Sequence, residues 1–180
     1  HKETIETGTK SAALGGITGI FEMPNTNPLT TTPEALEHKI KRAEDTSYTD
    51  FAFYFGGTLQ NSKNLPDWEL LPGVCGIKIF MGSSTGDLLS ATDEEVEAVV
   101  SNGKRVIAVH AEDEFMMNDN KETILKDSND VGMHCKWRSV ESSLNATRRV
   151  VNLGKKHNRH IHVLHLSLIH ISEPTRPVTI

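Results

Sequence analysis

Residues 76–81 read GIKIFM, an apolar run with Lys78 in its middle. Pro72 and Gly73 come before this stretch and Gly82 follows it, and a short apolar run between such residues is typical of a strand buried on both faces. A buried ammonium group without a partner is costly, so burial favours the neutral amine. The stretch therefore predicts a central strand of a parallel sheet, with a lysine that has a chemical role.

Strand-like and helix-like segments alternate on both sides of this run. β-Branched and aromatic residues predict strands at 17–24, 51–57, 74–80, 104–110 and 159–165. Apolar spacing, threonine N-caps and closing glycines predict helices at 2–16, 32–47, 92–103 and 137–157. This alternation is typical of βα units built around a parallel sheet.

The expected fold class is α/β, in the form of a (β/α)8 barrel of the TIM type. A closed barrel needs about 250 residues, whereas the chain has 180 residues and material for about five βα units. We therefore expect residues 1–165 to form part of a barrel. The alternative is an open doubly wound sheet, which is disfavoured because no glycine fingerprint for a dinucleotide follows any of the strands.

Composition narrows the class of protein. The net charge of −5 argues against a nucleic-acid surface, and no apolar run approaches the length of a membrane span. The two cysteines, Cys75 and Cys135, lie far apart in the sequence, which fits a reducing compartment. These features predict a cytoplasmic protein that acts on a small molecule.

The last residues have a different character. Residues 166–176 read like the translation of an adapter used to prepare DNA sequencing libraries. We therefore expect 166–180 to be a non-native tail that takes no part in the fold, the alternative being a genuine irregular terminus.

Polar residues at the carboxyl ends of the predicted strands outline a site, because barrel active sites lie at that end. They are Asn25, Lys78, His110 and His165. Two imidazoles from different strands predict a metal site, with zinc as the natural ion. Lys78 could form a Schiff base with a carbonyl substrate, or add carbon dioxide to become a carbamate that ligates metal. The two histidines favour the metal.

Other motifs near these strands can be explained without a role in the site. Strict alternation would place His162 on the opposite face from His165, as a structural residue. The loop 82–86, GSSTG, could cradle a phosphate but fits an ordinary flexible loop equally well. The acidic stretch 111–122 could offer metal ligands, although most of it is typical of a solvated helix start.

Several motifs occur together in the order found in dihydroorotases of the amidohydrolase superfamily. They are KETIETGTKSAALGGIT at 2–18, FEMPNTNP at 21–28, GIKIFMGSSTGDL at 76–88, VHAEDE at 109–114 and HIHVLHLS at 160–167. The chain resembles the lysine-bearing branch of that family. The resemblance implies a metal-dependent hydrolase barrel with two divalent ions, usually zinc, that interconverts dihydroorotate and N-carbamoyl-L-aspartate in pyrimidine biosynthesis.

The resemblance also implies a role for each candidate residue. Lys78 matches the carboxylated lysine that bridges the two metals, His110 and His165 match ligands of the second metal, and Asn25 matches the residue that binds the substrate carboxylate. The H-x-H pair for the first metal and the arginine after it would precede His1, and the catalytic aspartate would lie beyond the tail. We therefore expect this chain alone to be inactive.

Two other functions remain open. A related cyclic amidohydrolase, such as an allantoinase or hydantoinase, would share the lysine and histidines but differ in how it holds its substrate. A dihydroorotase-like chain could instead be a non-catalytic partner of aspartate transcarbamoylase. The resemblance is compatible with a homodimer or with that association.

Overall fold

The computed structural model describes residues 3–82, 86–124 and 130–166, and these contain one sheet of five parallel strands. The strands are β1 (Gly19–Glu22), β2 (Asp50–Gly56), β3 (Val74–Phe80), β4 (Ile107–His110) and β5 (Ile161–Val163). They pair in sequence order from β1 to β5. A doubly wound sheet would reverse direction along its strand order and carry helices on both faces, so that alternative is excluded.

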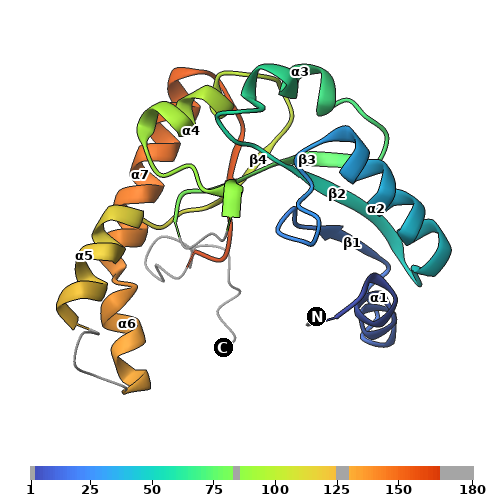
Figure 1. The fold of residues 1–180 in the computed structure, drawn as a ribbon, viewed down its shortest axis with the longest axis horizontal. Helices are drawn as coiled ribbons and strands as arrows, with labels where there is room; N and C mark the ends of the chain where they lie inside the picture. The colour runs from blue at the N-terminus through green and yellow to red at the C-terminus, as the bar shows by residue number, and fades with distance from the viewer. Residues whose placement is uncertain (1–2, 83–85, 125–129, 167–180) are drawn as a thin grey trace, which may run out of the picture.

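The helices lie around the outer, convex side of the curved sheet (Figure 1). They are α1 (Ile5–Leu14), α2 (Pro33–Thr46), α3 (Leu65–Trp68), α4 (Asp93–Val100), α5 (Glu114–Ile124), α6 (His134–Trp137) and α7 (Val140–Lys156). Short 3-10 turns are η1 (Ser62–Asn64), η2 (Gly86–Leu88) and η3 (Val131–Met133). The result is a half-barrel, which confirms the fold class expected from the sequence.

Local sequence sets the helix starts as predicted. The Thr32 side chain accepts a hydrogen bond from the Ala35 amide, and Pro33 occupies the first turn of α2. Thr92 and Glu95 form a reciprocal capping box at the start of α4. In these two βα units, residues close in sequence therefore determine where the helix begins after the strand.

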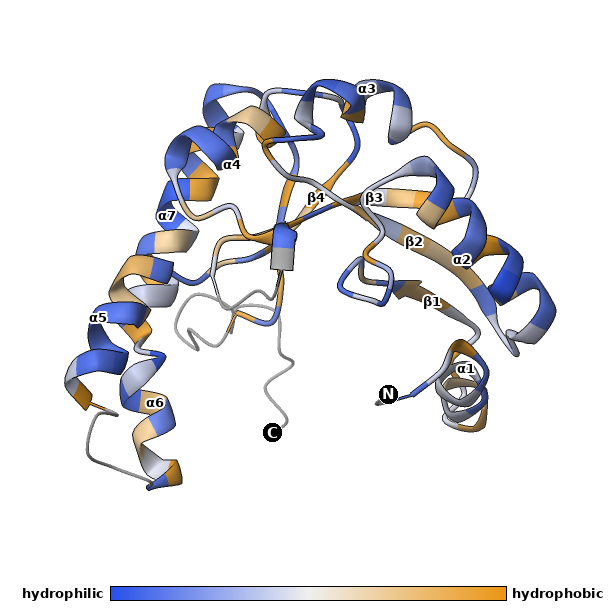
Figure 2. Ribbon diagram, in the orientation of Figure 1, coloured by the Kyte–Doolittle hydropathy of each residue, from blue (hydrophilic) through white to orange (hydrophobic). Residues whose placement is uncertain are grey.

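The two faces of the sheet differ. Ile77 and Ile79 in β3 are fully buried and belong to the hydrophobic core, and Figure 2 shows the strands as the apolar part of the fold and the helices as largely polar outside. On the other face, Phe21 packs edge-on against Tyr54 yet remains 66% exposed. The concave face is therefore the open one, and by alternation it is also the face of Lys78.

A buried ion pair closes the amino end of the sheet. Glu69, at the end of α3, lies 2.8 Å from the Arg159 guanidinium just before β5. Its carboxylate also accepts hydrogen bonds from the backbone amides of Lys104 and Arg105, in the connection that leads into β4. One side chain thus joins three connections that are distant in sequence.

The predicted boundary between the barrel at 1–165 and a tail at 166–180 stays a prediction, because 167–180 lie outside the described residues. The same holds for the centre of the 82–86 loop, where 83–85 are not described. No described helix has both the length and the apolar character needed to cross a membrane.

Candidate metal centre

Two predicted site histidines meet at the carboxyl end of the sheet. His110 is the last residue of β4, and His165 lies two residues beyond the end of β5. The Nδ1 atom of His110 is 3.0 Å from the Nε2 atom of His165. His165 has a φ of +36°, an uncommon value for a residue with a side chain, and this local turn accompanies its approach to His110.

The same turn explains why the expectation for His162 was wrong. Pairing aligns Lys78 with Ala108 and Ala108 with His162, so these three residues share the concave face. Alternation would hold only if β5 continued to His165, but the strand ends at Val163. His162 and His165 therefore both belong to the site side of the sheet, and His162 is solvent-exposed there.

Lys78 is 2% exposed in the middle of the sheet, two residues from the end of β3. Its Nζ donates a hydrogen bond of 2.9 Å to the Ile79 carbonyl and lies 4.0 Å from the centre of the Phe80 ring. No ion pair joins it to a carboxylate within the described part of the chain. Desolvation lowers the pKa of Lys78 to about 7, so a substantial share of the amine is neutral near neutral pH.

The surroundings of Lys78 and His165 disfavour the protonated forms of these two side chains. Burial lowers the pKa of His165, and the positive charges of His110 and Lys78 lower it further. Neutral imidazole nitrogens and a neutral amine are the forms that can act as ligands or nucleophiles. The three side chains thus influence one another directly at one end of the sheet.

The two imidazoles fit a metal ion. Two nitrogens bound to one tetrahedral zinc at 2.0–2.1 Å stand about 3.3 Å apart, close to the 3.0 Å between His110 and His165. Among the described residues, no cluster of three or more His, Cys, Asp or Glu side chains forms a complete site. Lys78, buried on the same face of the sheet, is the further ligand that the sequence predicts.

Glu112 and Arg138 belong to the site but were not predicted. The Glu112 carboxylate lies 2.6 Å from His110 Nε2 and pairs through both of its oxygens with Arg138, at the end of α6. Burial alone would raise the pKa of Glu112, but hydrogen bonds from His110 and Arg138 outweigh it and hold that pKa at about 2. A histidine followed two residues later by glutamate was the only local signal, since Arg138 is 26 residues away from Glu112.

Asn25 lies in the exposed loop after β1, at the same end of the sheet. The loop is tied down because the Thr30 amide donates to the Pro24 carbonyl and the Gly56 amide donates to the Thr30 carbonyl. None of the hydrogen bonds or ion pairs found for the described residues joins Asn25 to Lys78, His110 or His165. The structure therefore brings three of the four predicted residues together and places the fourth at the same edge.

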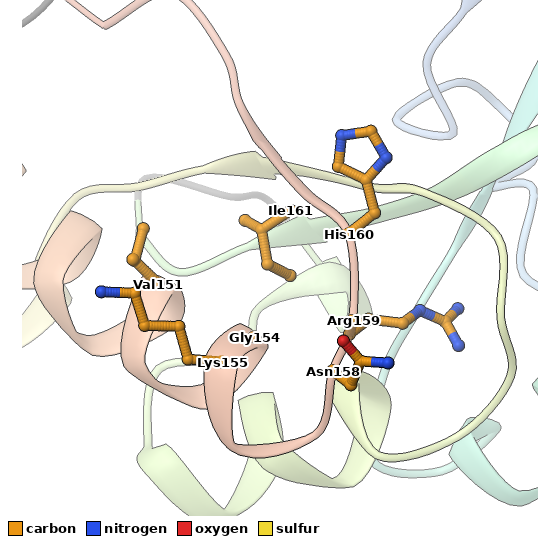
Figure 3. A pocket seen from close by; sticks show the side chains of 7 residues that line it. All are labelled: Val151, Gly154, Lys155, Asn158, Arg159, His160 and Ile161. Atoms are coloured by element: carbon orange, nitrogen blue, oxygen red, sulfur yellow. The ribbon is translucent and has the colours of Figure 1, made fainter.

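A hollow of about 440 Å³ lies elsewhere, at the amino end of β5. It is bordered by the end of α7 and by residues 158–161, and the Arg159 guanidinium points away from Val151 and Lys155 (Figure 3). That guanidinium is engaged by Glu69 and is not offered to the hollow. The hollow is therefore separate from the histidine site.

A family model described as dihydro-orotase-like matches residues 1–166. The chain belongs to the dihydro-orotase-like family. A dihydroorotase from Thermococcus kodakarensis is 31% identical over 178 residues, covering 94% of this chain and 36% of that protein. An allantoinase from Deinococcus radiodurans is 32% identical, covering 93% of this chain and 38% of that protein.

Solved structures support the same fold. The L-hydantoinase (dihydropyrimidinase) from Arthrobacter aurescens matches with a TM-score of 0.79 and 31% identity, over 91% of this chain and 37% of that one. The chain thus spans a little more than one third of the length of the relatives it matches. The family assignment confirms the resemblance inferred from the motifs around Lys78, His110 and His165.

Proposed function

We propose that a protein containing this segment is a dihydroorotase, which reversibly hydrolyses the ring amide of dihydroorotate to N-carbamoyl-L-aspartate. The observation that carries the proposal is the meeting of His110 and His165 at 3.0 Å beside the buried Lys78, in a chain of the dihydro-orotase-like family. We place this activity in cytoplasmic pyrimidine biosynthesis.

Lys78 carries the most distinctive chemistry in the proposal. Its neutral amine attacks carbon dioxide, a nitrogen–carbon bond forms, and a proton is lost to solvent to give a carbamate anion. The low pKa supports this step because only the neutral amine has the lone pair that attacks. The carbamate anion would lie in an apolar strand, so metal cations would be needed to compensate its charge. A Schiff base between Lys78 and a carbonyl substrate would need no metal ion.

His110 Nδ1 and His165 Nε2 would hold one of two divalent ions, for which imidazole nitrogens make zinc the natural choice. Such ions supply a water of lowered pKa and polarise a carbonyl. Asn25 would donate its side-chain amide to the substrate carboxylate from the loop after β1. The ligands of the other ion and the proton-transferring acid are not assigned to any residue of this chain.

An alternative substrate class is supported by the comparisons themselves. An allantoinase and an L-hydantoinase match this chain at identities similar to those of the dihydroorotases. All three names describe cyclic-amide hydrolysis, and the features described for this site do not distinguish the rings. Dihydroorotase is favoured because the family model and most of the curated relatives carry that name.

The test begins with the source DNA, read across both ends of this segment without adapters. The complete reading frame is then expressed, and hydrolysis of dihydroorotate, allantoin and hydantoin is compared with zinc bound. Fastest turnover of dihydroorotate, lost in Lys78→Ala and His165→Ala, is expected. Faster turnover of another ring would support the alternative substrate class.

Two further outcomes would contradict the proposal more deeply. Borohydride trapping of a carbonyl substrate on Lys78, without any need for metal, would establish a Schiff-base enzyme. Full-length protein that binds no zinc and turns over none of the rings would favour the non-catalytic role, and co-purification with aspartate transcarbamoylase would then test the partner. A homodimer would be recognised by its mass in solution.

A further inference from the structure

Glu112 is placed to control one nitrogen of His110. Its carboxylate reaches Nε2 at 2.6 Å, while the opposite ring nitrogen, Nδ1, faces His165. An ionised carboxylate can only accept a hydrogen bond, so Nε2 must carry the proton in this contact. In the neutral ring Nδ1 is then left with its lone pair pointing toward His165.

Glu112 itself is held in place. Arg138 Nε donates to Oε1 at 2.9 Å, and Arg138 Nη2 donates to Oε2, the oxygen that also contacts His110. The Glu112 side chain is 12% exposed and that of Arg138 is 27% exposed, so solvent competes little for the carboxylate. Arg138 Nη2 is 3.5 Å from His110 Nε2, well beyond the carboxylate contact, so the guanidinium acts on the ring through Glu112.

We propose that Glu112, anchored by Arg138, is a positioning residue that keeps His110 in the Nε2–H tautomer with Nδ1 free as the ligand nitrogen. This inference rests on the proposed metal site. Carboxylates that orient a metal-binding histidine commonly change metal affinity by 10–100-fold when removed. Neither Glu112 nor Arg138 needs to touch the metal or the substrate in this role.

The chain contains a matched control for the contact. Glu97 lies 2.6 Å from His157 Nε2, the same carboxylate–imidazole distance, on α4 and at the end of α7. Glu97 contacts Lys156 as well, so it too pairs with a cation. It is remote from His110 in the fold, and its removal should therefore leave the His110 tautomer unchanged.

The first readout is the tautomer of His110 in the metal-free 180-residue chain, measured by two-bond ¹H–¹⁵N correlations and assigned with His110→Asn. We expect the Nε2–H form in the wild type and in Glu97→Ala. Glu112→Ala should shift the ring toward the Nδ1–H form. Glu112→Gln should preserve the wild-type tautomer, because its amide oxygen still accepts from Nε2. Arg138→Gln, which leaves the acceptor unanchored, should give an intermediate population.

The second readout is zinc affinity, measured by competition with a chromophoric chelator. Glu112→Ala should bind zinc 10–100-fold more weakly than the wild type, and Glu112→Gln should recover most of that loss. An Nδ1–H ring in the wild type, or a tautomer unchanged by Glu112→Ala, would overturn the inference. A wild-type chain with the expected tautomer but no zinc binding would uphold the control of the tautomer by Glu112 and contradict a zinc site formed by His110 and His165 within this chain alone.

Discussion

Two charged side chains, Glu69 and Lys78, are each only 2% exposed, yet their surroundings are opposite. Glu69, at the amino end of the sheet, accepts from the Arg159 guanidinium and from two backbone amides. Lys78, toward the carboxyl end, donates to one carbonyl and has no carboxylate partner among the described residues. The charge of Glu69 is therefore compensated by its partners, whereas the amine of Lys78 is not and can react.

The difference follows the division of labour in barrels, where the amino end of the sheet stabilises and the carboxyl end carries the active site. A compensated charge such as Glu69 has little tendency to react, because both of its oxygens already accept hydrogen bonds. An uncompensated amine such as Lys78 gains stability by losing its proton or by acquiring a partner. The same cost of burying a charge therefore has two results. At the amino end it is met by the Glu69–Arg159 ion pair, called the clamp below, and at the carboxyl end it leaves Lys78 as a reactive amine.

The largest effect is expected from breaking the clamp. Glu69→Gln leaves the buried Arg159 guanidinium without a counter-charge, which should lower the free energy of unfolding by about 3–5 kcal/mol. Urea unfolding of the chain measures this change. Glu97→Gln, at an ion pair on the surface, is the control and should have little effect. A loss for Glu69→Gln as small as the control's would show that water reaches Arg159.

A second effect concerns Cys75, which lies in the same strand as Lys78. Burial raises the pKa of the Cys75 thiol to about 11, so at pH 8 its thiolate should be about two-hundredfold scarcer than that of an ordinary thiol. Iodoacetamide should therefore label the exposed Cys135 first. The rate at Cys75 should rise about tenfold for each pH unit between pH 8 and 10. A plateau below pH 9 would show that the partly buried Cys75 is not desolvated enough to raise its pKa.

Burial thus acts on Cys75 and Lys78 in the same direction, against charge, with opposite chemical results. The thiol keeps its proton and becomes inert, whereas the amine loses its proton and becomes a nucleophile. Their separation by only three residues along β3 shows that the two faces and the two ends of one strand can be given different chemistry.

Removing the uncompensated charge should stabilise the chain. Lys78→Met keeps an apolar side chain of similar length and eliminates the desolvation cost, so metal-free stability at pH 7 should rise by on the order of 2 kcal/mol. Lys39→Met is the matched control, because Lys39 is also buried but pairs with Glu22 at 2.9 Å. Burial also lowers the pKa of Lys39, but Glu22 offsets part of that effect, so Lys39→Met should change the stability less than Lys78→Met does. Destabilisation by Lys78→Met would indicate a partner that compensates its charge.

Much of the half-barrel could be predicted from local signals. These signals each depend on residues close in sequence. They are the apolar run around Lys78, the N-caps at Thr32 and Thr92, and the alternation of strand-like and helix-like segments. The placement of His162 could not be predicted, because it depends on where β5 ends and on the positive φ of His165. These are properties of the folded chain, and strict alternation gave the wrong face.

Site residues could be predicted from the sequence only where a metal-binding residue type occurs at the end of a predicted strand, as His110 and His165 do. Glu112 was hidden in an acidic stretch that is typical of a helix start, although α5 begins only at Glu114. Arg138 carries no local mark, since its role exists only through the distant Glu112. A residue such as Arg138, which acts by holding another side chain in place, leaves no recognisable spacing or periodicity in the sequence.

The smallest effect tests how tightly the clamp is packed. Gly103 and Gly16 have nearly the same positive φ, +87° and +81°. A Cβ at Gly103 would lie 2.5 Å from the Glu69 carboxylate, whereas a Cβ at Gly16 would meet nothing within 4 Å. Gly16→Ala should therefore cost about 1 kcal/mol of backbone strain.

Gly103→Ala should cost the same strain plus the displacement of Glu69, roughly 2 kcal/mol in total. Thermal unfolding of both variants gives the difference, which belongs to the clamp because the backbone strain is common to both. Repeating Gly103→Ala in a Glu69→Ala background should reduce its cost to that of Gly16→Ala, since the colliding carboxylate is gone. Equal costs for the two glycines in the wild-type background would mean that Glu69 can move aside, and that the Glu69–Arg159 pair is not tightly packed around Gly103.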